Sequence, residues 1–312
     1  MPWTPDDIPA QHGRVAVVTG ANGGLGLATT RELARKGAHV VMAVRNLDKA
    51  EKARDQLLTE LPTASLELVA LDLGSLASVE AAARTILETH PTLDLLVNNA
   101  GVMAIPEGRT EDGFERQFGI NHLGHFALTA RLLPALAATA GSRVVAVTST
   151  ARHLGRPVDP ANPHLEGAYE PWKAYGQSKL ANLHFAVELH HRLQQAGAPV
   201  ASLVAHPGFS NTELQQHSAE TTGGITQRFG HGLVRKVGTS PDHGAHSQLR
   251  AATDPDARSG ELYAPRFVNF GPAVRRPLVG RSVDRRATRR LWIVSAREAG
   301  VNFEVAKAVA GA

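Results

Sequence analysis

Short apolar runs alternate with longer amphipathic segments through most of the chain. Short apolar runs are typical of strands buried on both faces of a parallel sheet, whereas apolar residues three and four apart are typical of helices. The pattern predicts strands over residues 14–19, 38–44, 65–71, 93–97, 142–148 and 200–205. It predicts helices between them over residues 25–36, 47–61, 76–90, 123–138 and 172–195.

Strands that alternate with helices along the chain are typical of repeated βαβ units. We therefore predict a single α/β domain of the Rossmann type, a doubly wound parallel sheet of about seven strands with helices on both faces. The seventh strand, residues 261–264, follows a gap of about fifty residues rich in Gly, Thr, His and Gln, which predicts a long excursion and not another regular βαβ unit.

The chain divides into three expected parts. Residues 1–12 form an N-terminal extension, and residues 13–270 form the domain, with a substrate loop at 213–241. Residues 271–312 form a C-terminal extension that is rich in arginine and contains a helix.

Composition narrows the class of protein. The 312 residues include no cysteine, which excludes disulfides, thiolate metal sites and cysteine nucleophiles. Residues 1–12 lack the basic flank and apolar core of a signal peptide. The longest apolar stretch, residues 127–140, is interrupted by Arg131 and Pro134, so it does not reach the roughly 18 residues of a membrane span. We expect a soluble, cytoplasmic protein.

The positive charge is local. The net charge is +4, but residues 275–290 hold seven arginines and one aspartate, which leaves −2 for the rest of the chain. Such a run could dock on an anionic membrane or nucleic acid. Because it leads into the amphipathic stretch 291–294, a solvated helix face or a contact between subunits is favoured, and no nucleic-acid partner is expected.

A glycine cluster separates the first strand from the first helix. Such a turn allows backbone N–H groups to approach an anion at the positive end of the helix. The alternative is a turn with a purely structural role, but the strand before it and the helix after it favour a dinucleotide site. The candidate contacts are Gly20, Asn22, Gly23, Gly24, Leu25 and Gly26.

The end of the second strand discriminates between cofactors. An NAD-binding fold normally carries a carboxylate there for the ribose 2′-hydroxyl, but this chain has Val44, Arg45 and Asn46. An arginine can pair with a 2′-phosphate, so the sequence predicts NADP(H), held by Arg45 and Asn46. A surface arginine without a ligand is the alternative.

Tyr175 and Lys179 stand four residues apart on the helix after the fifth strand, and therefore on one helical face. A nearby ammonium favours the phenolate, so we expect Lys179 to lower the pKa of Tyr175 toward the working range. The preceding strand ends in hydroxyl side chains, including Ser149, at the carboxyl edge of the sheet where open α/β folds bind ligands.

These residues and several short motifs resemble the short-chain dehydrogenase/reductase family, especially its retinol dehydrogenase-like and protochlorophyllide reductase-like branch. The resemblance is strong over residues 13–212. Its elements are the glycine turn, Leu71-Asp72-Leu73, Asn98-Asn99-Ala100-Gly101, Asn121-His122-Leu123-Gly124-His125-Phe126, Ser149, Tyr175 with Lys179, and His206-Pro207-Gly208.

The resemblance implies an NADP(H)-dependent alcohol/carbonyl oxidoreductase. Tyr175 would exchange the proton, Ser149 would bind the substrate oxygen, Lys179 would hold the nicotinamide ribose, and Asn121 would position a water on the proton path. Asp72 with Leu73 would contact the adenine, and Asn98, Ala100 and Gly101 would line the adenosine ribose. Pro207, Gly208 and Thr212 would border the nicotinamide and its phosphates. A homodimer or homotetramer is expected by the same resemblance.

Several alternatives remain. His122 with His125, or His190 with His191, could be read as metal ligands, but the first pair lies in a family motif and the second should point to different sides of a helix, so no metal is expected. Asn98 and Asn121 could be structural caps. A silent dinucleotide-binding module or a sugar-nucleotide epimerase are rival functions. The expected substrate is a small apolar or aromatic alcohol, ketone or aldehyde, lined by residues 151–172 and 213–241.

Overall fold

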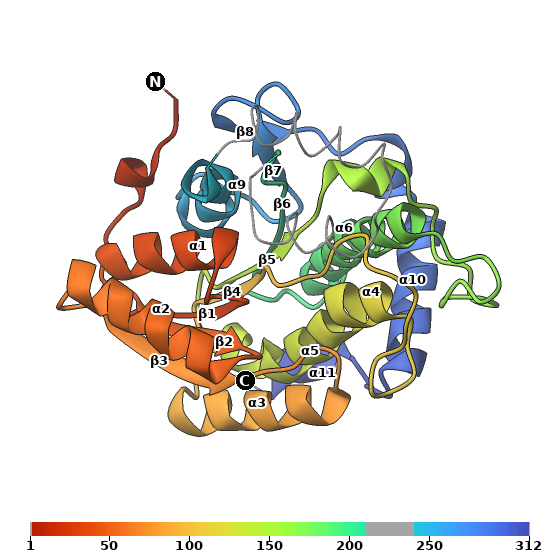
Figure 1. The fold of residues 1–312 in the computed structure, drawn as a ribbon, viewed down its shortest axis with the longest axis horizontal. Helices are drawn as coiled ribbons and strands as arrows, with labels where there is room; N and C mark the ends of the chain where they lie inside the picture. The colour runs from red at the N-terminus through yellow and green to blue at the C-terminus, as the bar shows by residue number, and fades with distance from the viewer. Residues whose placement is uncertain (1, 210–239, 312) are drawn as a thin grey trace.

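The structure, a computed structural model, describes residues 2–209 and 240–311 (Figure 1). Their sheet has eight strands in the order β3-β2-β1-β4-β5-β6-β7-β8. All neighbours pair in parallel except β7 and β8, which are antiparallel. The strands are β1 (Val15–Thr19), β2 (His39–Val44), β3 (Ser65–Ala70), β4 (Leu95–Asn98), β5 (Arg143–Val147), β6 (Ala201–Ala205), β7 (Leu262–Pro265) and β8 (Ala273–Arg276).

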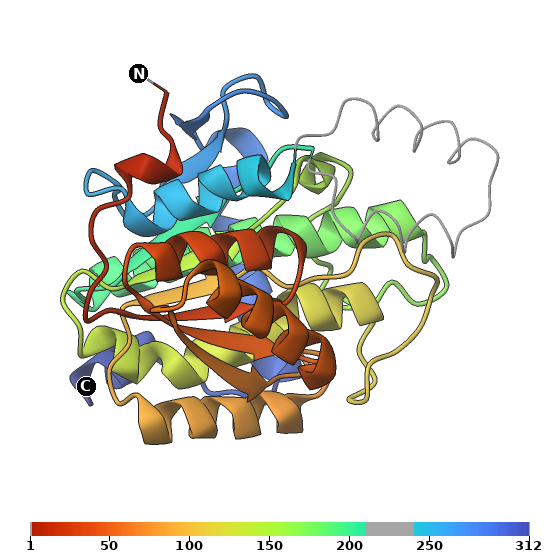
Figure 2. The same ribbon diagram turned by 60° about the vertical axis from the view of Figure 1, so that its left-hand side comes forward.

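Helices cover both faces of the sheet, as the alternating pattern predicts. In Figure 2, α1 in red and α3 in light orange lie on opposite sides of the first strands. The longer helices are α1 (Gly24–Arg35), α2 (Leu47–Glu60), α3 (Leu76–Thr89), α5 (Gly124–Ala137), α6 (Pro171–Gln195), α9 (Pro241–Thr253) and α10 (Arg285–Glu298). Short helices are α4 (Arg116–Phe118) and α11 (Val305–Ala310).

The strand residues alternate between two cores. Val17 and Val41 pack with α3, α5, α6 and α10 on one face. Their neighbours Ala16 and Val40 pack with α1 and α9 on the other face. Because successive side chains of a strand point to opposite faces, strands this apolar must be covered on both sides. The Rossmann-type fold predicted from the sequence is confirmed.

The expected long excursion before β7 is wrong for its second part. Residues 241–253 form α9, which packs against α1 and connects β6 to the parallel strand β7. Ser240 caps the helix by accepting a hydrogen bond from His243 N, and Pro241 occupies the first turn. Its buried face consists largely of alanine, glycine, serine and glutamine, so the hydrophobic signal in the sequence is weak.

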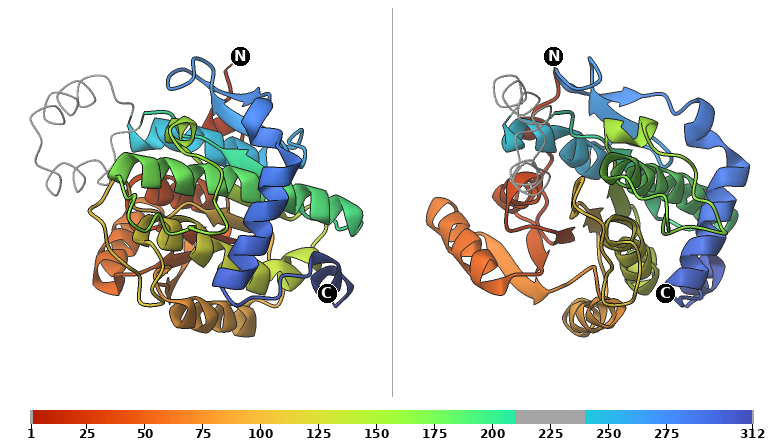
Figure 3. Two further views of the ribbon diagram at one scale, coloured as in Figure 1. Left: turned by 90° about the vertical axis from the view of Figure 1, so that its right-hand side faces the viewer. Right: turned by 45° about the vertical axis from the view of Figure 1, so that its right-hand side comes forward.

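The arginine-rich segment contains the expected helix, α10, and also a strand that was not expected, β8. β8 pairs with β7, and Arg275 forms a 2.9 Å ion pair with Glu261. In α10, which lies beside α6 in Figure 3, Arg285 contacts the buried Glu188 of α6 at 3.0 Å. Arg275 and Arg285 therefore fasten this segment to the sheet and to α6. In the described parts of the chain, no helix is long and apolar enough to cross a membrane.

Candidate active site

The structure brings Tyr175, Ser149 and Lys179 together at the carboxyl end of β5. Ser149 follows β5 and caps the short helix η3 (Thr150–His153), accepting a hydrogen bond from Ala151 N. The Tyr175 phenol lies beside the Ser149 side chain. Lys179 Nζ lies 5.8 Å from the centre of the Tyr175 ring. The three side chains thus share one buried site, although only two of them are close in sequence.

Three features hold the end of β5 and the turn after it against α6. A Cβ on Gly176 would lie 2.6 Å from Ala151 O and from Gly155 N, so only glycine allows this approach. Thr148 Oγ1 donates to Lys179 O at 2.7 Å, which ties the strand end to the helix backbone. Lys179 Nζ in turn donates to Val147 O at 3.3 Å. Strand and helix therefore position Ser149 beside Tyr175.

Burial dominates the electrostatics of this pair. Burial raises the pKa of Tyr175 to about 12, although the neighbouring Ser149 side chain acts in the opposite direction. Burial also lowers the pKa of Lys179 to about 8. The expected lowering of the Tyr175 pKa by Lys179 is therefore wrong for the protein by itself, because desolvation penalises the phenolate more strongly.

Asn121 lies in a single π-helical turn, η2 (Gly119–Leu123), that precedes α5. Its side chain accepts from Val102 N at 2.7 Å and donates to Val102 O and to Ser178 Oγ, both at 2.9 Å. A Cβ on Gly101 would lie 2.9 Å from Asn121 Oδ1 and 3.4 Å from Lys179 Nζ. The loop after β4 thus passes directly over Lys179, and π-turns of this kind occur often at functional sites.

A buried hydrogen-bond network joins the first glycine turn to this loop. Thr19 Oγ1 accepts from Asn99 N at 2.9 Å and from Ala100 N at 3.0 Å, and it contacts His125 Nε2 at 2.9 Å. His125 Nδ1 contacts Asn121 O at 2.9 Å. Because a carbonyl oxygen only accepts, Nδ1 carries the imidazole proton and the Thr19 hydroxyl donates to Nε2.

His125 belongs to a motif found in the sequence, but no role was predicted for it or for Thr19. Both side chains are almost fully buried, and burial lowers the pKa of His125 to about 4, so the imidazole is neutral. A histidine among apolar residues at the start of α5 was the available signal. Its partner could not be inferred, because Thr19 is 106 residues away in sequence.

The glycine turn has the geometry of a cradle for an anion. Gly20 and Gly24 have positive φ, at 66° and 50°, which favours glycine. A Cβ on Gly26 would collide with Gly20 O. Gly23 is the N-cap of α1, and among the described residues no side chain caps this end. Asn22 precedes this N-cap, and Leu25 lies in the first turn of α1. Because no described side chain caps this end, the first N–H groups of the helix can face a phosphate.

The other candidate cofactor residues lie along the carboxyl edge of the sheet. They differ in exposure and in the hydrogen bonds that their side chains already make. Arg45 is exposed directly after β2. Asn46 Oδ1 caps α2 by accepting from Lys49 N at 2.8 Å. Asp72 Oδ1 accepts from Gly74 N at 2.8 Å, next to the buried Leu73.

The edge continues after β4 and β6. Asn98 is buried and donates to Thr129 Oγ1 at 2.9 Å, which favours the structural alternative for its side chain. Ala100 and Gly101 remain half exposed beside it. Pro207 and Gly208 follow β6, and Gly208 has a φ of 79°. Thr212 and residues 213–239 of the expected substrate loop lie outside the described residues.

Among the described residues, neither histidine pair belongs to a group of three or more side chains that could hold a metal ion. His122 Nε2 bonds to Ser295 Oγ at 2.7 Å, and burial lowers the pKa of His122 to about 3. His122 and His125 are thus neutral packing groups with partners. The side chains of His190 and His191 do not diverge as expected, because their ring centres are 5.0 Å apart.

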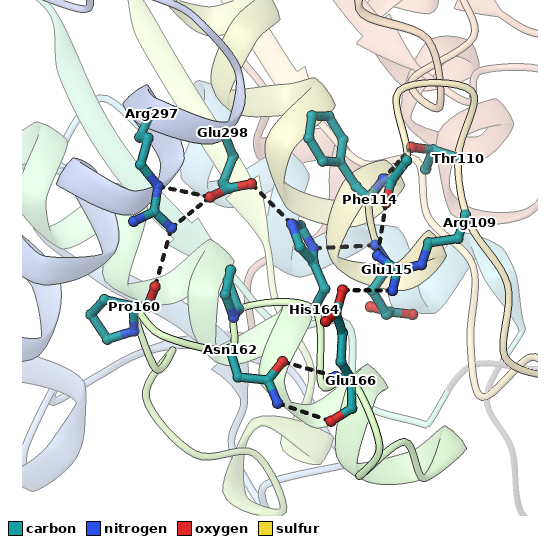
Figure 4. Close-up of polar contacts among 12 residues, drawn as sticks. Arg109, Thr110, Phe114, Glu115, Pro160, Asn162, His164, Glu166, Arg297 and Glu298 are labelled. Carbon is teal, nitrogen blue, oxygen red and sulfur yellow. Dashed lines mark hydrogen bonds and ion pairs between the residues drawn. The ribbon is translucent and has the colours of Figure 1, made fainter.

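Polar contacts pin the segment that runs from Ser149 to Tyr175 (Figure 4). His164 Nδ1 accepts from Glu115 N at 3.2 Å, and His164 Nε2 contacts Glu298 of α10 at 2.9 Å. Arg109 pairs with Glu166 at 2.9 Å. The expected lining of the substrate pocket is therefore braced by α10 and by the loop before α4. These braces, Glu115 above all, were missed by sequence reasoning.

Comparison with known proteins places the chain. A family model described as short chain dehydrogenase matches residues 14–223. The chain is 42% identical over 302 residues to polyprenol dehydrogenase of Mus musculus, covering 96% of this chain and 87% of that protein. It is 37% identical over 302 residues to retinol dehydrogenase 14 of Homo sapiens, covering 93% and 87%.

Solved structures agree with these relatives. A putative uncharacterized protein from Mycobacterium paratuberculosis superposes with a TM-score of 0.81 at 40% identity, covering 97% of this chain and 99% of that one. The L-sorbose reductase from Gluconobacter frateurii, solved with NADPH and L-sorbose, has a TM-score of 0.63 at 21% identity, covering 82% and 95%. The second likeness concerns the fold alone.

The sheet order and the position of the buried tyrosine at its carboxyl edge define a class, the Rossmann-type oxidoreductases. The family match and the relatives are more specific. The chain belongs to the short-chain dehydrogenase family, in its retinol dehydrogenase-like branch, so the resemblance inferred from the motifs is confirmed. Members of this family use NAD(P)(H) to interconvert alcohols and carbonyls by hydride transfer.

Proposed function

We propose that the chain is an NADP(H)-dependent oxidoreductase that interconverts an alcohol and a ketone or aldehyde, with Tyr175 as general acid and base. The observation that carries this proposal is the position of the buried Tyr175 beside the Ser149 side chain, one helical turn from Lys179. The three groups lie at the carboxyl end of β5, where open α/β sheets bind their ligands.

In the reducing direction, Tyr175 and Ser149 hydrogen bond to the carbonyl oxygen of the substrate. The nicotinamide, when bound, supplies the hydride that reduces the carbonyl carbon. Tyr175 transfers its proton to the oxygen as the C=O π bond breaks, and the phenolate remains. Because burial raises the pKa of Tyr175 to about 12, the phenol keeps its proton until the more basic alkoxide develops.

Lys179 restores the proton and holds the cofactor ribose. Its pKa of about 8 keeps the ammonium mostly charged at neutral pH while leaving its proton easier to move. Asn121, whose side chain is fixed by Val102 and Ser178, would order a water on this path. In the oxidising direction the proton moves from the alcohol to Tyr175.

The residues fit a dinucleotide. The uncapped start of α1 would face the pyrophosphate. Gly26 and Gly101 allow the close packing of the two loops that would hold it, because a Cβ at either position would press on Gly20 O or on Asn121. Arg45, exposed after β2, would pair with the 2′-phosphate, with Asn46 beside it. The contacts that the family resemblance implies are proposed for Asp72, Leu73, Asn98, Ala100, Gly101, Pro207, Gly208 and Thr212. The side chain of Asn98 bonds to Thr129, and Thr212 lies outside the described residues.

The substrate class is proposed from the relatives. Polyprenol and retinol, the substrates in the names of two relatives, are apolar alcohols. This supports an apolar alcohol or carbonyl substrate. Arg152 is the basic side chain closest in sequence to Ser149, and its guanidinium donates to Ser149 O at 2.9 Å. That contact leaves it less suited to clamp an acidic substrate.

The Tyr175→Phe variant tests the mechanism. We expect it to fold and bind NADPH but to lose carbonyl reduction by about 10² to 10⁴, the contribution of a positioned general acid. Ser149→Ala should mainly lower turnover, and Lys179→Ala should damage turnover and NADPH affinity together. The matched control is Tyr263→Phe, because the Tyr263 hydroxyl bonds to Glu261 and lies outside the site. Near-normal turnover of Tyr175→Phe would remove the proposed proton donor.

The Arg45→Ala variant tests the cofactor. Calorimetry should show NADP(H) bound at least tenfold more tightly than NAD(H) by the wild type, and the variant should lose most of this difference. Arg54→Ala is the control, because Arg54 is a neighbouring arginine on α2 paired with Asp55. Equal affinities in the wild type would show that Arg45 does not read the 2′-phosphate.

A further inference from the structure

A second cluster of chemistry-bearing side chains lies at the amino end of the sheet, away from the active site. His39 is the first residue of β2, Glu67 lies on the edge strand β3, and His90 is the C-cap of α3. His39 pairs in register with Ser65, so Ser65 and Glu67 point to one face of β3. His90 reaches the cluster from α3, which packs on that face of the sheet.

The three side chains converge on one point. His90 Nε2 lies 2.7 Å and His39 Nε2 lies 3.2 Å from the same oxygen, Glu67 Oε2. The two imidazole ring centres are 4.8 Å apart. One ligand atom from each residue lies within 4.8 Å of the others. Each nitrogen thus faces the carboxylate instead of solvent.

We infer that His39, Glu67 and His90 form a binding site for one divalent transition-metal ion of the zinc type. Zinc bonds of about 2.0 to 2.2 Å in a tetrahedron separate neighbouring ligand atoms by roughly 3.3 to 3.5 Å. The two nitrogen–oxygen separations here, 2.7 and 3.2 Å, are somewhat shorter, and all three ligand atoms lie within 4.8 Å of one another. Side-chain shifts of this size would place all three ligands around one ion. Two imidazoles and one carboxylate suit zinc, cobalt or nickel better than magnesium or calcium.

The surroundings prepare the ligands. His39 Nδ1 contacts Ser65 Oγ at 2.7 Å. A proton on Nδ1 donated to Ser65 would leave the lone pair of Nε2 directed at the ion, and such outer partners orient metal-binding histidines.

The exposure of the cluster and its number of ligands also suit a metal ion. The side chains of His39, Glu67 and His90 are 26%, 27% and 13% exposed, so an ion can enter and water can complete its coordination. His164 with Glu298 offers one imidazole and one carboxylate only. Among the described residues, His39, Glu67 and His90 are the group in which three potential ligands lie together.

The proposed metal site lies far from the active site, at a place where an ion would have a structural role. β2 spans six residues, from His39 to Val44, so the cluster lies roughly 17 Å along the strand from the edge that carries Arg45. An ion there would join β2, β3 and the end of α3. Metal binding should therefore stabilise the edge of the sheet without changing the chemistry at Tyr175.

The test uses the untagged full-length chain, stripped with a chelator and dialysed. Titration with ZnCl₂ by calorimetry should show one equivalent bound, and the unfolding temperature should rise with ZnCl₂ concentration. Glu67→Gln and His90→Gln should each weaken binding by at least about tenfold. His164→Gln is the matched control and should bind as the wild type. Circular dichroism checks the folding of each variant.

A second readout separates this site from general adsorption. Bound Co²⁺ should show visible absorption of a low-coordinate site in the wild type, and Glu67→Gln should lose it. The inference is overturned if the wild type binds no stoichiometric Zn²⁺, or if binding survives in folded Glu67→Gln and His90→Gln. It is also overturned if His164→Gln loses binding to the same extent. None of these measurements depends on the proposed enzyme activity.

Discussion

Replacement of Thr19 by valine probes the network that joins the two turns of the cofactor edge. Valine matches threonine in shape but has no hydroxyl. The change removes an acceptor for Asn99 N and Ala100 N and a donor to His125 Nε2. The site is closed, since Thr19 is fully buried and His125 is 2% exposed.

The expected cost follows from these lost partners. A buried polar group left without a partner costs about 1 to 3 kcal/mol. Ala100 N and His125 Nε2 lose their partner, whereas Asn99 N keeps its second acceptor, Val97 O, at 3.0 Å. Because the bond from Ala100 N is only partly buried, we expect Thr19→Val to lower the free energy of unfolding by about 2 to 4 kcal/mol. Affinity for NADPH should fall as well, because the glycine turn and the loop after β4 lose their common anchor.

Two variants calibrate this value. Thr19→Ser keeps the hydroxyl and loses one methyl group, which costs about 1 kcal/mol. Thr148→Val removes a single hydrogen bond, to Lys179 O, and should cost about 1 to 3 kcal/mol. Urea unfolding followed by tryptophan fluorescence at neutral pH gives all three values. If Thr19→Val unfolds within about 1 kcal/mol of Thr19→Ser, the network does not carry the energy argued for it.

Three further predictions follow from burial and close contacts. The value of kcat/KM for carbonyl reduction should fall above pH 8, because burial lowers the pKa of Lys179 to about 8 and the ammonium loses its proton. Gly26→Ala should weaken NADPH binding, since its Cβ would collide with Gly20 O, whereas Gly311→Ala should not. The free energy of unfolding should decrease as pH falls below 6.5, because buried His122, with a pKa of about 3, gains a proton only on unfolding.

Each of these has a clear contrary result. A rate of reduction that stays constant to pH 10 would contradict the need for a charged Lys179. Unchanged NADPH affinity in Gly26→Ala, measured by calorimetry, would place the dinucleotide elsewhere. Equal urea midpoints at pH 7 and pH 5 would show that His122 is not held neutral by the fold.

Local pattern was sufficient for most of the secondary structure. The expected helix 47–61 is observed as Leu47–Glu60, and the expected strand 38–44 as His39–Val44. Both elements could be predicted because the spacing of apolar residues is visible within a short stretch of sequence. The helix α9 was missed because small and polar residues form much of its buried face, and the short strand β8 because its pairing with β7 decides it.

The sequence by itself determined the family, the glycine turn and the pair Tyr175 and Lys179, because each is encoded by residues a few positions apart. Only the tertiary structure decided what these groups meet. Ser149 reaches Tyr175 because the end of β5 packs on α6, and burial there raises the tyrosine pKa instead of lowering it. Thr19 meets His125, and His39 meets Glu67, through sheet packing between residues distant in sequence, which no local pattern specifies.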